Sequence, residues 1–343
     1  MAKKATKKSE AWVYFDHIVA DAAPRGLHSN PWILNEKGQA VFSPDFDTLQ
    51  RLLGVPLYLA AGTQSGVPAL ALDVWLSYEF RRAGFQTDQV WPRPSHPRIL
   101  PAPVAALISN LNTPFRRELE RVIADTASIK GVTSASSIIL GKNYTKQVDV
   151  VISDWATGPE LLVSTKRMDS SYGKNAANRV EESYGDAKNL RLRHPLASLG
   201  FVFGLRSDIF EKAPNKAPWL FDLLEKLGQE DDAYHATCLV LMEYDGTSYQ
   251  VPEPDGDNST AELPGTGSDD ETAELPAELP ENEIAKGLAN LPKVSILHDK
   301  TPNELAPARF LATMVMRILS TTPVTMHAEA RARMAAIKPS IKA

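Results

Sequence analysis

The feature that most constrains the fold is an ordered run of β-rich and helical segments in the middle of the chain. Three short β-rich segments come first, then a helical pattern, then another apolar segment, at residues 137–140, 147–153, 160–166, 175–193 and 199–205. Strands that follow one another in sequence usually pair, and a helix between two strands usually returns the chain in parallel. The sequence therefore predicts an α/β fold with a mixed (α+β) sheet and one crossover helix.

Amphipathic helices are expected on the N-terminal side of these strands. Residues 45–53 form a short one, and residues 68–83 form a stronger one that ends before Gly84 and has an apolar face of Leu72, Trp75, Leu76 and Phe80. A further helix over residues 104–127 is interrupted near Pro114 and carries a stripe of Phe115, Leu119, Val122 and Ile123. Between them, residues 91–103 contain five prolines and are expected as a connector, because proline suits neither a helix interior nor a central strand.

The charge distribution is uneven along the chain. Residues 252–283 hold eleven acidic residues and no Lys or Arg, so the rest of the chain carries +6 although the whole chain carries −5. A basic body can bind a polyanion, but an ordinary solvated surface with an acidic spacer explains the charge equally well. We expect a disordered basic arm, an N-terminal helical or recognition region, a central core, an acidic disordered linker and a C-terminal helical region, at residues 1–10, 11–103, 104–250, 251–284 and 285–343.

Several classes of protein are disfavoured by composition. The single cysteine, Cys238, excludes an internal disulfide and a zinc site built from clustered cysteines. No apolar run reaches the roughly 18 residues that a membrane span needs. The first ten residues resemble no secretory signal, so we expect a cytoplasmic protein.

Polar groups interrupt the two central strands at one position each. Strand residues alternate between faces, which places Val148, Val150 and Ile152 together and leaves Asp149 on the other face with Val151. In the next strand Leu162, Ser164 and Lys166 share a face. A charge in a largely apolar strand is costly unless it is paired or binds a metal. Asp149 and Lys166 are therefore candidate functional groups, although a turn cap, an ion pair or a solvated strand end would also account for them.

The helix over residues 175–193 offers the third charged group. At about 100° per residue, Val180, Tyr184, Ala187, Ala177 and Ala176 cluster on one side, with Glu181 on the flank and Glu182 toward solvent. Lys174, Asn178 and Lys188 fall near the flank of Glu181 and are expected to meet a phosphate backbone. Arg191 either contacts phosphate as well or interacts with the helix C-terminus.

These residue types match the needs of metal-assisted phosphodiester cleavage. Mg²⁺ prefers hard oxygen ligands, commonly one or two carboxylates plus waters and substrate phosphate. Asp149 and Glu181 supply carboxylates, the carbonyl of Thr165 adds a neutral oxygen, and Lys166 can stabilise developing negative charge. The expected cofactor is therefore Mg²⁺.

The same residues resemble the motif of the PD-(D/E)XK nuclease superfamily. Asp149 matches the Asp of the first half-motif, with Val148 where the family often has Pro. Ser164-Thr165-Lys166 matches the second half with Ser in place of the acid, as in a group of type II restriction endonucleases whose acid comes from the following helix. Glu181 would then be that acid. The resemblance covers roughly residues 110–206 and gives Glu118 the place of an accessory metal ligand, unless Glu118 only pairs with Arg121.

The resemblance implies a Mg²⁺-dependent endonuclease that hydrolyses double-stranded DNA, of the type II restriction or phage-defence kind. Cutting both strands is simplest with two active sites, so a homodimer is expected. A catalytically silent DNA-binding module on the same fold is one alternative. A nuclease-fold subunit of a repair or transposition complex is another, and the choice between DNA and RNA stays open.

Overall fold

A mixed β-sheet forms the centre of the molecule. The structure is a computed structural model that describes residues 5–124, 126, 129, 132–134, 136–172, 175–229, 233–246 and 275–337. Across those ranges the main sheet has the order β10-β9-β8-β7-β6-β3, with bounds Ser295–Ile296, Ala236–Glu243, Ser198–Arg206, Gly158–Met168, Val150–Asp154 and Val90–Trp91. The three central strands β7, β8 and β9 are parallel, and β6 and β10 flank them in antiparallel. The predicted mixed α/β fold and the parallel return after the crossover helix are confirmed.

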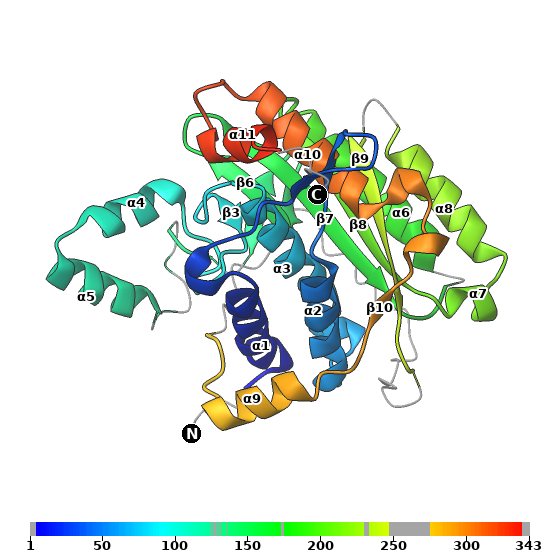
Figure 1. Cartoon of the computed structure of the whole chain (residues 1–343), viewed down its shortest axis with the longest axis horizontal. Coiled ribbons are helices and arrows are strands. Elements are labelled where there is room, and N and C mark those ends of the chain that lie inside the picture. The colour runs from blue at the N-terminus through cyan, green and yellow to red at the C-terminus, as the bar shows by residue number, and fades with distance from the viewer. Residues whose placement is uncertain are drawn as a thin grey trace.

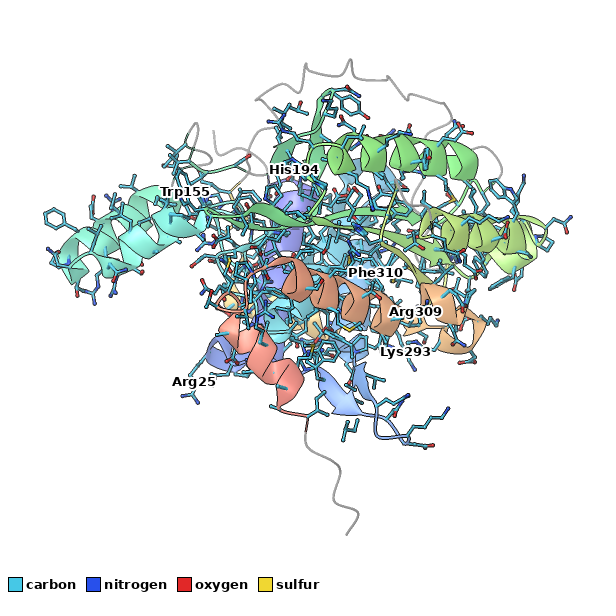
Figure 2. The ribbon with its side chains drawn as sticks, turned by 90° about the horizontal axis from the view of Figure 1, so that it is seen from above. Arg25, Trp155, His194, Lys293, Arg309 and Phe310 are labelled. Carbon is cyan, nitrogen blue, oxygen red and sulfur yellow. The ribbon has the colours of Figure 1, made fainter. Side chains whose placement is uncertain are left out.

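Helices cover both faces of this sheet (Figure 2). One apolar core lies between the sheet and α1 (Lys7–Ala22), α2 (Phe46–Tyr58), α3 (Val67–Arg82) and α10 (Pro307–Thr321). A second core lies between the opposite face and α6 (Asn175–Arg191) and α8 (Lys216–Leu227). Alternate residues of each strand point to opposite cores, as the period of two requires: Leu161 and Val163 enter the first, and Leu162 enters the second.

Smaller elements decorate this body (Figure 1). They are the hairpins β1 (Trp32–Leu34) with β2 (Ala40–Phe42) and β4 (Ser137–Leu140) with β5 (Thr145–Val148), and the helices α4 (Ala102–Asn110), α5 (Thr113–Ala124), α7 (Ile209–Lys212), α9 (Glu281–Ala289) and α11 (Ala328–Ala335). The hairpin over residues 137–148 matches the sequence prediction. None of the helices in the described ranges combines the length and apolar character needed to cross a bilayer.

Helix α3 is the central helix of the first core. Its predicted apolar residues Leu72, Trp75, Leu76 and Phe80 are fully buried, and most of its other side chains are buried as well. A helix enclosed on all sides must pair or hydrogen-bond its polar residues. This requirement applies to Glu79 and Arg82 near its end and to Asp73 near its middle.

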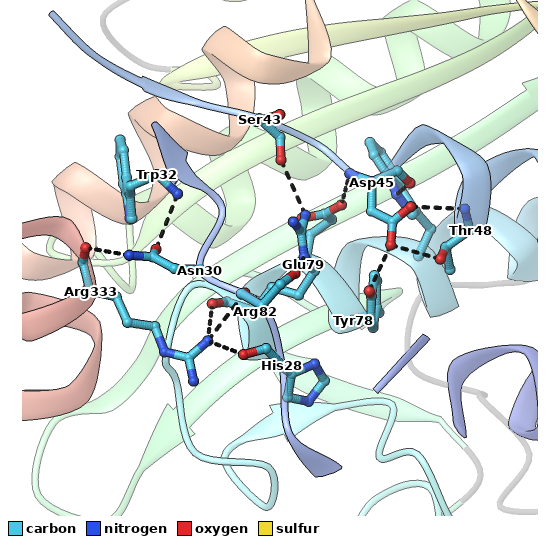
Figure 3. Close-up of polar contacts among 12 residues, drawn as sticks. His28, Asn30, Trp32, Ser43, Asp45, Thr48, Tyr78, Glu79, Arg82 and Arg333 are labelled. Atoms are coloured by element: carbon cyan, nitrogen blue, oxygen red, sulfur yellow. Dashed lines mark hydrogen bonds and ion pairs between the residues drawn. The ribbon is translucent and has the colours of Figure 1, made fainter. Parts of the chain in front are cut away.

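Glu79 and Arg82 anchor α3 to the start of α2 and to α11 (Figure 3). Their side chains form a buried ion pair of 2.6 Å, and Glu79 also accepts a hydrogen bond of 2.6 Å from the backbone N–H of Asp45, the N-cap of α2. Burial raises the pKa of Glu79 to about 7. Arg333 of α11 donates to the carbonyl of Arg82 at 2.7 Å, so the C-terminal helix is fixed to the end of α3.

Gly84 allows this close contact between α3 and α11. Its φ is +104°, and a Cβ at this position would lie 2.7 Å from the backbone of Ala330. We expect Gly84→Ala to lower the free energy of unfolding by more than the roughly 1–3 kcal/mol of backbone strain alone. Gly26→Ala is the matched control, because Gly26 has φ +74° and nothing within 4 Å of the added carbon. Chemical denaturation of both variants measures the difference, and equal losses would contradict the role of the α11 contact.

Helices α4 and α5 correct one expectation about the core. The predicted break near Pro114 is confirmed, but Phe115, Leu119 and Val122 are 66%, 40% and 41% exposed. Only Ile123 of the predicted stripe is buried. The stripe does not face the sheet because the two helices pack against each other and project from the body (Figure 1).

Two of the region boundaries expected from sequence differ from those in the structure. Residues 7–10, expected in a disordered arm, form the first turn of α1 because Thr6 and Ser9 build a capping box. Helix α9 begins at Glu281, inside the range expected as linker. Residues 251–274 of that linker lie outside the described residues. The N-terminal helices and β3 share the core of the main sheet, while the assignment of functions to the five expected regions stays a prediction.

Candidate active site

Asp149 lies at a break between two strands. The chain from 145 to 154 divides into β5, which pairs with β4, and β6, which pairs with β7 from Val150 onward. Val148 therefore enters the second core while Val150 enters the first, so the expectation that these two residues share a face is wrong. Beyond the end of the β6–β7 ladder, the backbone N–H of Thr165 donates to the carboxylate of Asp149 at 2.7 Å. The Asp149 carboxylate thus accepts the hydrogen bond that a backbone carbonyl of a paired strand would otherwise accept from Thr165.

A second carboxylate, which the sequence analysis missed, reaches the same residue from the helix side. The hydroxyl of Thr165 donates to Asp73 Oδ1 at 2.5 Å, and Asp73 is only 7% exposed on α3. Thr165 thus holds Asp149 through its backbone and Asp73 through its side chain. These contacts involve the N–H and the hydroxyl of Thr165. The metal ligation expected from its carbonyl stays a prediction.

Burial raises the pKa of both carboxyl groups, and the charge of Asp149 raises the pKa of Asp73 further. For Asp73 burial is the largest cause and the charge of Asp149 adds to it, so its pKa lies well above the ordinary value. For Asp149 burial again dominates. Lys166 opposes the shift at both groups, which places its ammonium near the pair. The buried carboxylate of Asp73 and the partly buried carboxylate of Asp149, beside one lysine, would leave a net negative charge that a divalent cation would offset.

The carboxylates of Asp73 and Asp149 fit Mg²⁺, although they fill only part of its coordination sphere. Among the residues that the structure describes, no group of three or more His, Cys, Asp or Glu side chains could enclose a metal ion. Mg²⁺ does not require such a group, because it usually retains waters and binds through one or two carboxylates together with substrate phosphate. Asp73 and Asp149 supply two hard oxygen donors whose positions Thr165 fixes.

Lys166 occupies the expected place near the end of β7. It is partly buried, and its backbone is paired through the register Lys166–Phe203 with β8. The structure therefore brings Asp149, Thr165 and Lys166 to one site, as their spacing suggested. Its charge opposes the rise in the pKa of both Asp73 and Asp149, so it lies within electrostatic range of the pair.

Ser164 has a positioning contact on the opposite side of β7. It is 7% exposed and lies close to the hydroxyl of Tyr234, whose raised pKa it partly offsets. That hydroxyl donates in turn to the backbone carbonyl of Ser183 on α6 at 3.0 Å. Ser164 therefore helps to set the position of α6 against β7, and the structure gives it no contact with Asp149.

The carboxylate of α6 that acts on Asp149 is Asp186. It forms an ion pair of 2.6 Å with Lys146 and accepts a hydrogen bond of 3.2 Å from the hydroxyl of Tyr144, both at the β4–β5 hairpin. Its charge raises the pKa of Asp149. Glu181 and Glu182 are both exposed.

The phase of α6 explains this difference. The buried side holds Ala176, Val180, Ser183 and Ala187, whereas Tyr184 is 37% exposed. Ser183, and not Tyr184, lies on the buried side. The helix is therefore rotated by part of a turn from the orientation expected from its apolar residues. Asp186 then lies on the flank toward the hairpin, and Glu181 lies nearer solvent. The metal-ligand role predicted for Glu181 has no supporting contact in the structure.

Glu118 lies apart from this cluster. It is on the projecting helix α5, where it is exposed and pairs with Arg121 at 2.7 Å. This is the i, i+3 pair that the sequence analysis considered as the alternative to an accessory metal ligand. The described structure does not bring Glu118 to Asp149, since α5 packs against α4.

The residues predicted to contact DNA lie along α6. Asn178 and Lys188 are exposed, and Arg191 is partly buried at the helix end. Lys174 lies outside the described residues. Their role in DNA binding stays a prediction.

Comparisons with known proteins identify no relative of this chain. No family model, curated protein or solved structure matches the chain. The restriction-endonuclease-like core therefore stays a hypothesis based on the motif of Asp149 and Ser164-Thr165-Lys166.

Proposed function

We propose that the protein is a Mg²⁺-dependent endonuclease that hydrolyses phosphodiester bonds of double-stranded DNA. The observation that carries the proposal is the arrangement of Asp73 and Asp149 on the two donors of Thr165, beside Lys166. Placing a buried carboxylate beside a partly buried one costs stability, and such a cost is commonly found at functional sites. A divalent cation is the partner that would relieve it.

Each residue of the cluster has a chemical role in this proposal. Asp73 and Asp149 hold the ion, which when bound polarises the phosphate and lowers the pKa of a coordinated water. Thr165 keeps both carboxylates in place. Lys166 stabilises the negative charge that develops on the phosphate oxygens. Asp186 positions the β4–β5 hairpin through Lys146 and Tyr144.

The family resemblance supports a restriction or phage-defence enzyme that acts as a homodimer. The Ser164-Thr165-Lys166 segment carries this part of the proposal, and Asp73 now joins Asp149 as a candidate ligand from a helix that precedes the strands. The two alternatives, a silent DNA-binding module and a subunit of a larger complex, both predict binding without cleavage by the purified chain.

Incubating the purified chain with supercoiled plasmid and genomic DNA, with Mg²⁺ or with EDTA, tests the proposal. We expect linear products with Mg²⁺ only, and discrete bands if cleavage is sequence-specific. A single-stranded RNA substrate in parallel decides between the nucleic acids. Intact DNA after incubation with Mg²⁺, together with salt-dependent duplex binding, would favour the silent module instead.

Two substitutions on α6 separate Asp186 from Glu181. We expect Asp186→Asn to lower the cleavage rate about 10–100-fold, the usual size for a group that orients metal ligands. It should also move the acid limb of the pH–rate profile to lower pH, because removing the Asp186 charge lowers the pKa of Asp149. Glu181→Gln is the matched change on the same helix, and we expect it to leave the profile in place. The reverse ranking would restore Glu181 as the α6 acid of the site.

A further inference from the structure

A cluster of basic side chains lies at the beginning of the parallel strands, away from the carboxylates. Arg191 ends α6 on one face of the sheet, Arg317 belongs to α10 on the other face, and His235 immediately precedes β9. Figure 2 shows these two helices on opposite sides of the sheet. All three side chains are partly buried.

The hydrogen bonds around His235 leave two N–H donors, one of His235 and one of Arg191, without an acceptor. The backbone N–H of Leu199 donates to His235 Nδ1 at 2.9 Å, so a neutral ring carries its proton on Nε2. Arg191 Nη1 lies 2.7 Å from that same Nε2. Burial and the charges of Arg317 and Arg191 lower the pKa of His235 to about 3, so the ring is neutral at physiological pH. Two N–H groups therefore face each other without an acceptor between them.

The two arginines also lack an acid. Arg317 Nε is buried and has no hydrogen-bond partner, and within the described part of the chain neither Arg317 nor Arg191 forms an ion pair. Arg191 donates only to the carbonyl of Ala233, at 3.3 Å. Arg191 contacts His235, and the charge of Arg317 acts on the same ring, so two guanidinium groups with unused donors are available there for an oxyanion.

We propose that Arg191, Arg317 and the Nε2–H of His235 bind a phosphate group, and that its source is the backbone of the DNA at the proposed active site. The phosphate chemistry follows from the donors alone, whereas the DNA source rests on the proposed function. Leu199 is paired with Leu162, four residues before Lys166 on the neighbouring strand. His235 precedes β9, two strands from β7, so at about 3.3 Å per residue and 4.8 Å between strands it lies roughly 16 Å from Lys166. That span equals a few nucleotides, which suits a phosphate beyond the cleaved one.

Arg317→Gln is the test variant, because the Arg317 side chain supports no other segment through a hydrogen bond or ion pair in the described structure. Arg309→Gln, on the same helix and with only a 3.7 Å pair to Glu304, is its control. Thermal unfolding is followed in inorganic phosphate against chloride at equal ionic strength. Phosphate should raise the Tm of the wild type and of Arg309→Gln by about 2–4 °C and leave Arg317→Gln unchanged.

Binding to a short duplex in EDTA, where no cleavage occurs, tests the source. The slope of log K against log salt should fall by about 0.9 in Arg317→Gln and stay constant in Arg309→Gln. These readouts do not depend on cleavage, so an inactive protein would not sink the phosphate site. A phosphate effect without a change in slope assigns the cluster to free phosphate and overturns the DNA source.

The chain itself contains a competing occupant in sequence. Glu230, Asp231 and Asp232 come directly before Ala233 and lie outside the described residues. The triple variant Glu230→Gln, Asp231→Asn, Asp232→Asn removes these charges. If phosphate stabilises this variant but not the wild type, the chain's own acids fill the cluster and the proposal is wrong. No phosphate effect in either protein would also overturn it.

Discussion

Asp149→Asn is expected to lose Mg²⁺-dependent DNA cleavage, with a rate at least about 10³-fold lower than the wild type. A bound metal contributes several kcal/mol of charge stabilisation at the phosphate, and each 1.36 kcal/mol is a tenfold change in rate. The Asn side chain still accepts the 2.7 Å hydrogen bond from the N–H of Thr165, so the break between β5 and β6 is retained. The loss would therefore reflect the missing charge. Single-turnover cleavage of a labelled duplex measures it.

Asp154→Asn, at the far end of β6, is the matched control. Asp154 accepts hydrogen bonds from Gln89 and from the N–H of Ala156, both distant from the cluster, so we expect nearly wild-type cleavage. Lys166→Met should lower the rate about 10²–10³-fold, the usual cost of removing a group that stabilises the developing charge. If Asp149→Asn and Lys166→Met both cleave as well as Asp154→Asn, this cluster is not the active site.

The pairing of β6, β7 and β8 could be predicted from sequence because its signals are local. The β-rich runs and the crossover helix each depend on a few neighbouring residues, and the parallel return of β8 follows from connection rules. The positions of β3 and β10 at the edges of the sheet, and the separation of the β4–β5 sheet from it, were not predicted. Asp149 and Lys166 stood out because each interrupts a short apolar pattern. Their meeting at Thr165 required only that consecutive strands pair.

Asp73 could not be placed in the site by the same reasoning. Its contact with Thr165 joins residues 92 positions apart, and the packing of α3 on β7 has no signature in the local pattern. The signal in the sequence was an acid within the apolar first half of the helix, a residue that must find a partner when buried. The error in the phase of α6 has a similar origin. Ser183 is buried because Tyr234 bonds to its carbonyl, and that contact is also long-range.

Asp73→Asn is expected to stabilise the protein at neutral pH and to remove its cleavage activity. Asn keeps an acceptor for the 2.5 Å bond from Thr165 but carries no charge toward Asp149. In the wild type, the folded pKa of Asp73 lies above its ordinary value of 3.8, so the native state binds the proton more tightly than the unfolded chain does. Stability present below pH 3.8 is then lost as the pH rises through the raised pKa. The variant lacks this loss.

The difference in Tm between Asp73→Asn and the wild type should therefore be near zero at pH 3.8 and grow toward neutral pH, reaching at least about 2 °C. Mg²⁺ provides the second measurement. It should raise the Tm of the wild type, whose paired carboxylates bind it, and have little effect on Asp73→Asn. Asp222→Asn, an exposed acid paired with Lys226, controls for the loss of one negative charge. A variant that is less stable than the wild type at neutral pH, or that Mg²⁺ stabilises equally, would show that Asp73 is a structural acid and not half of a metal site.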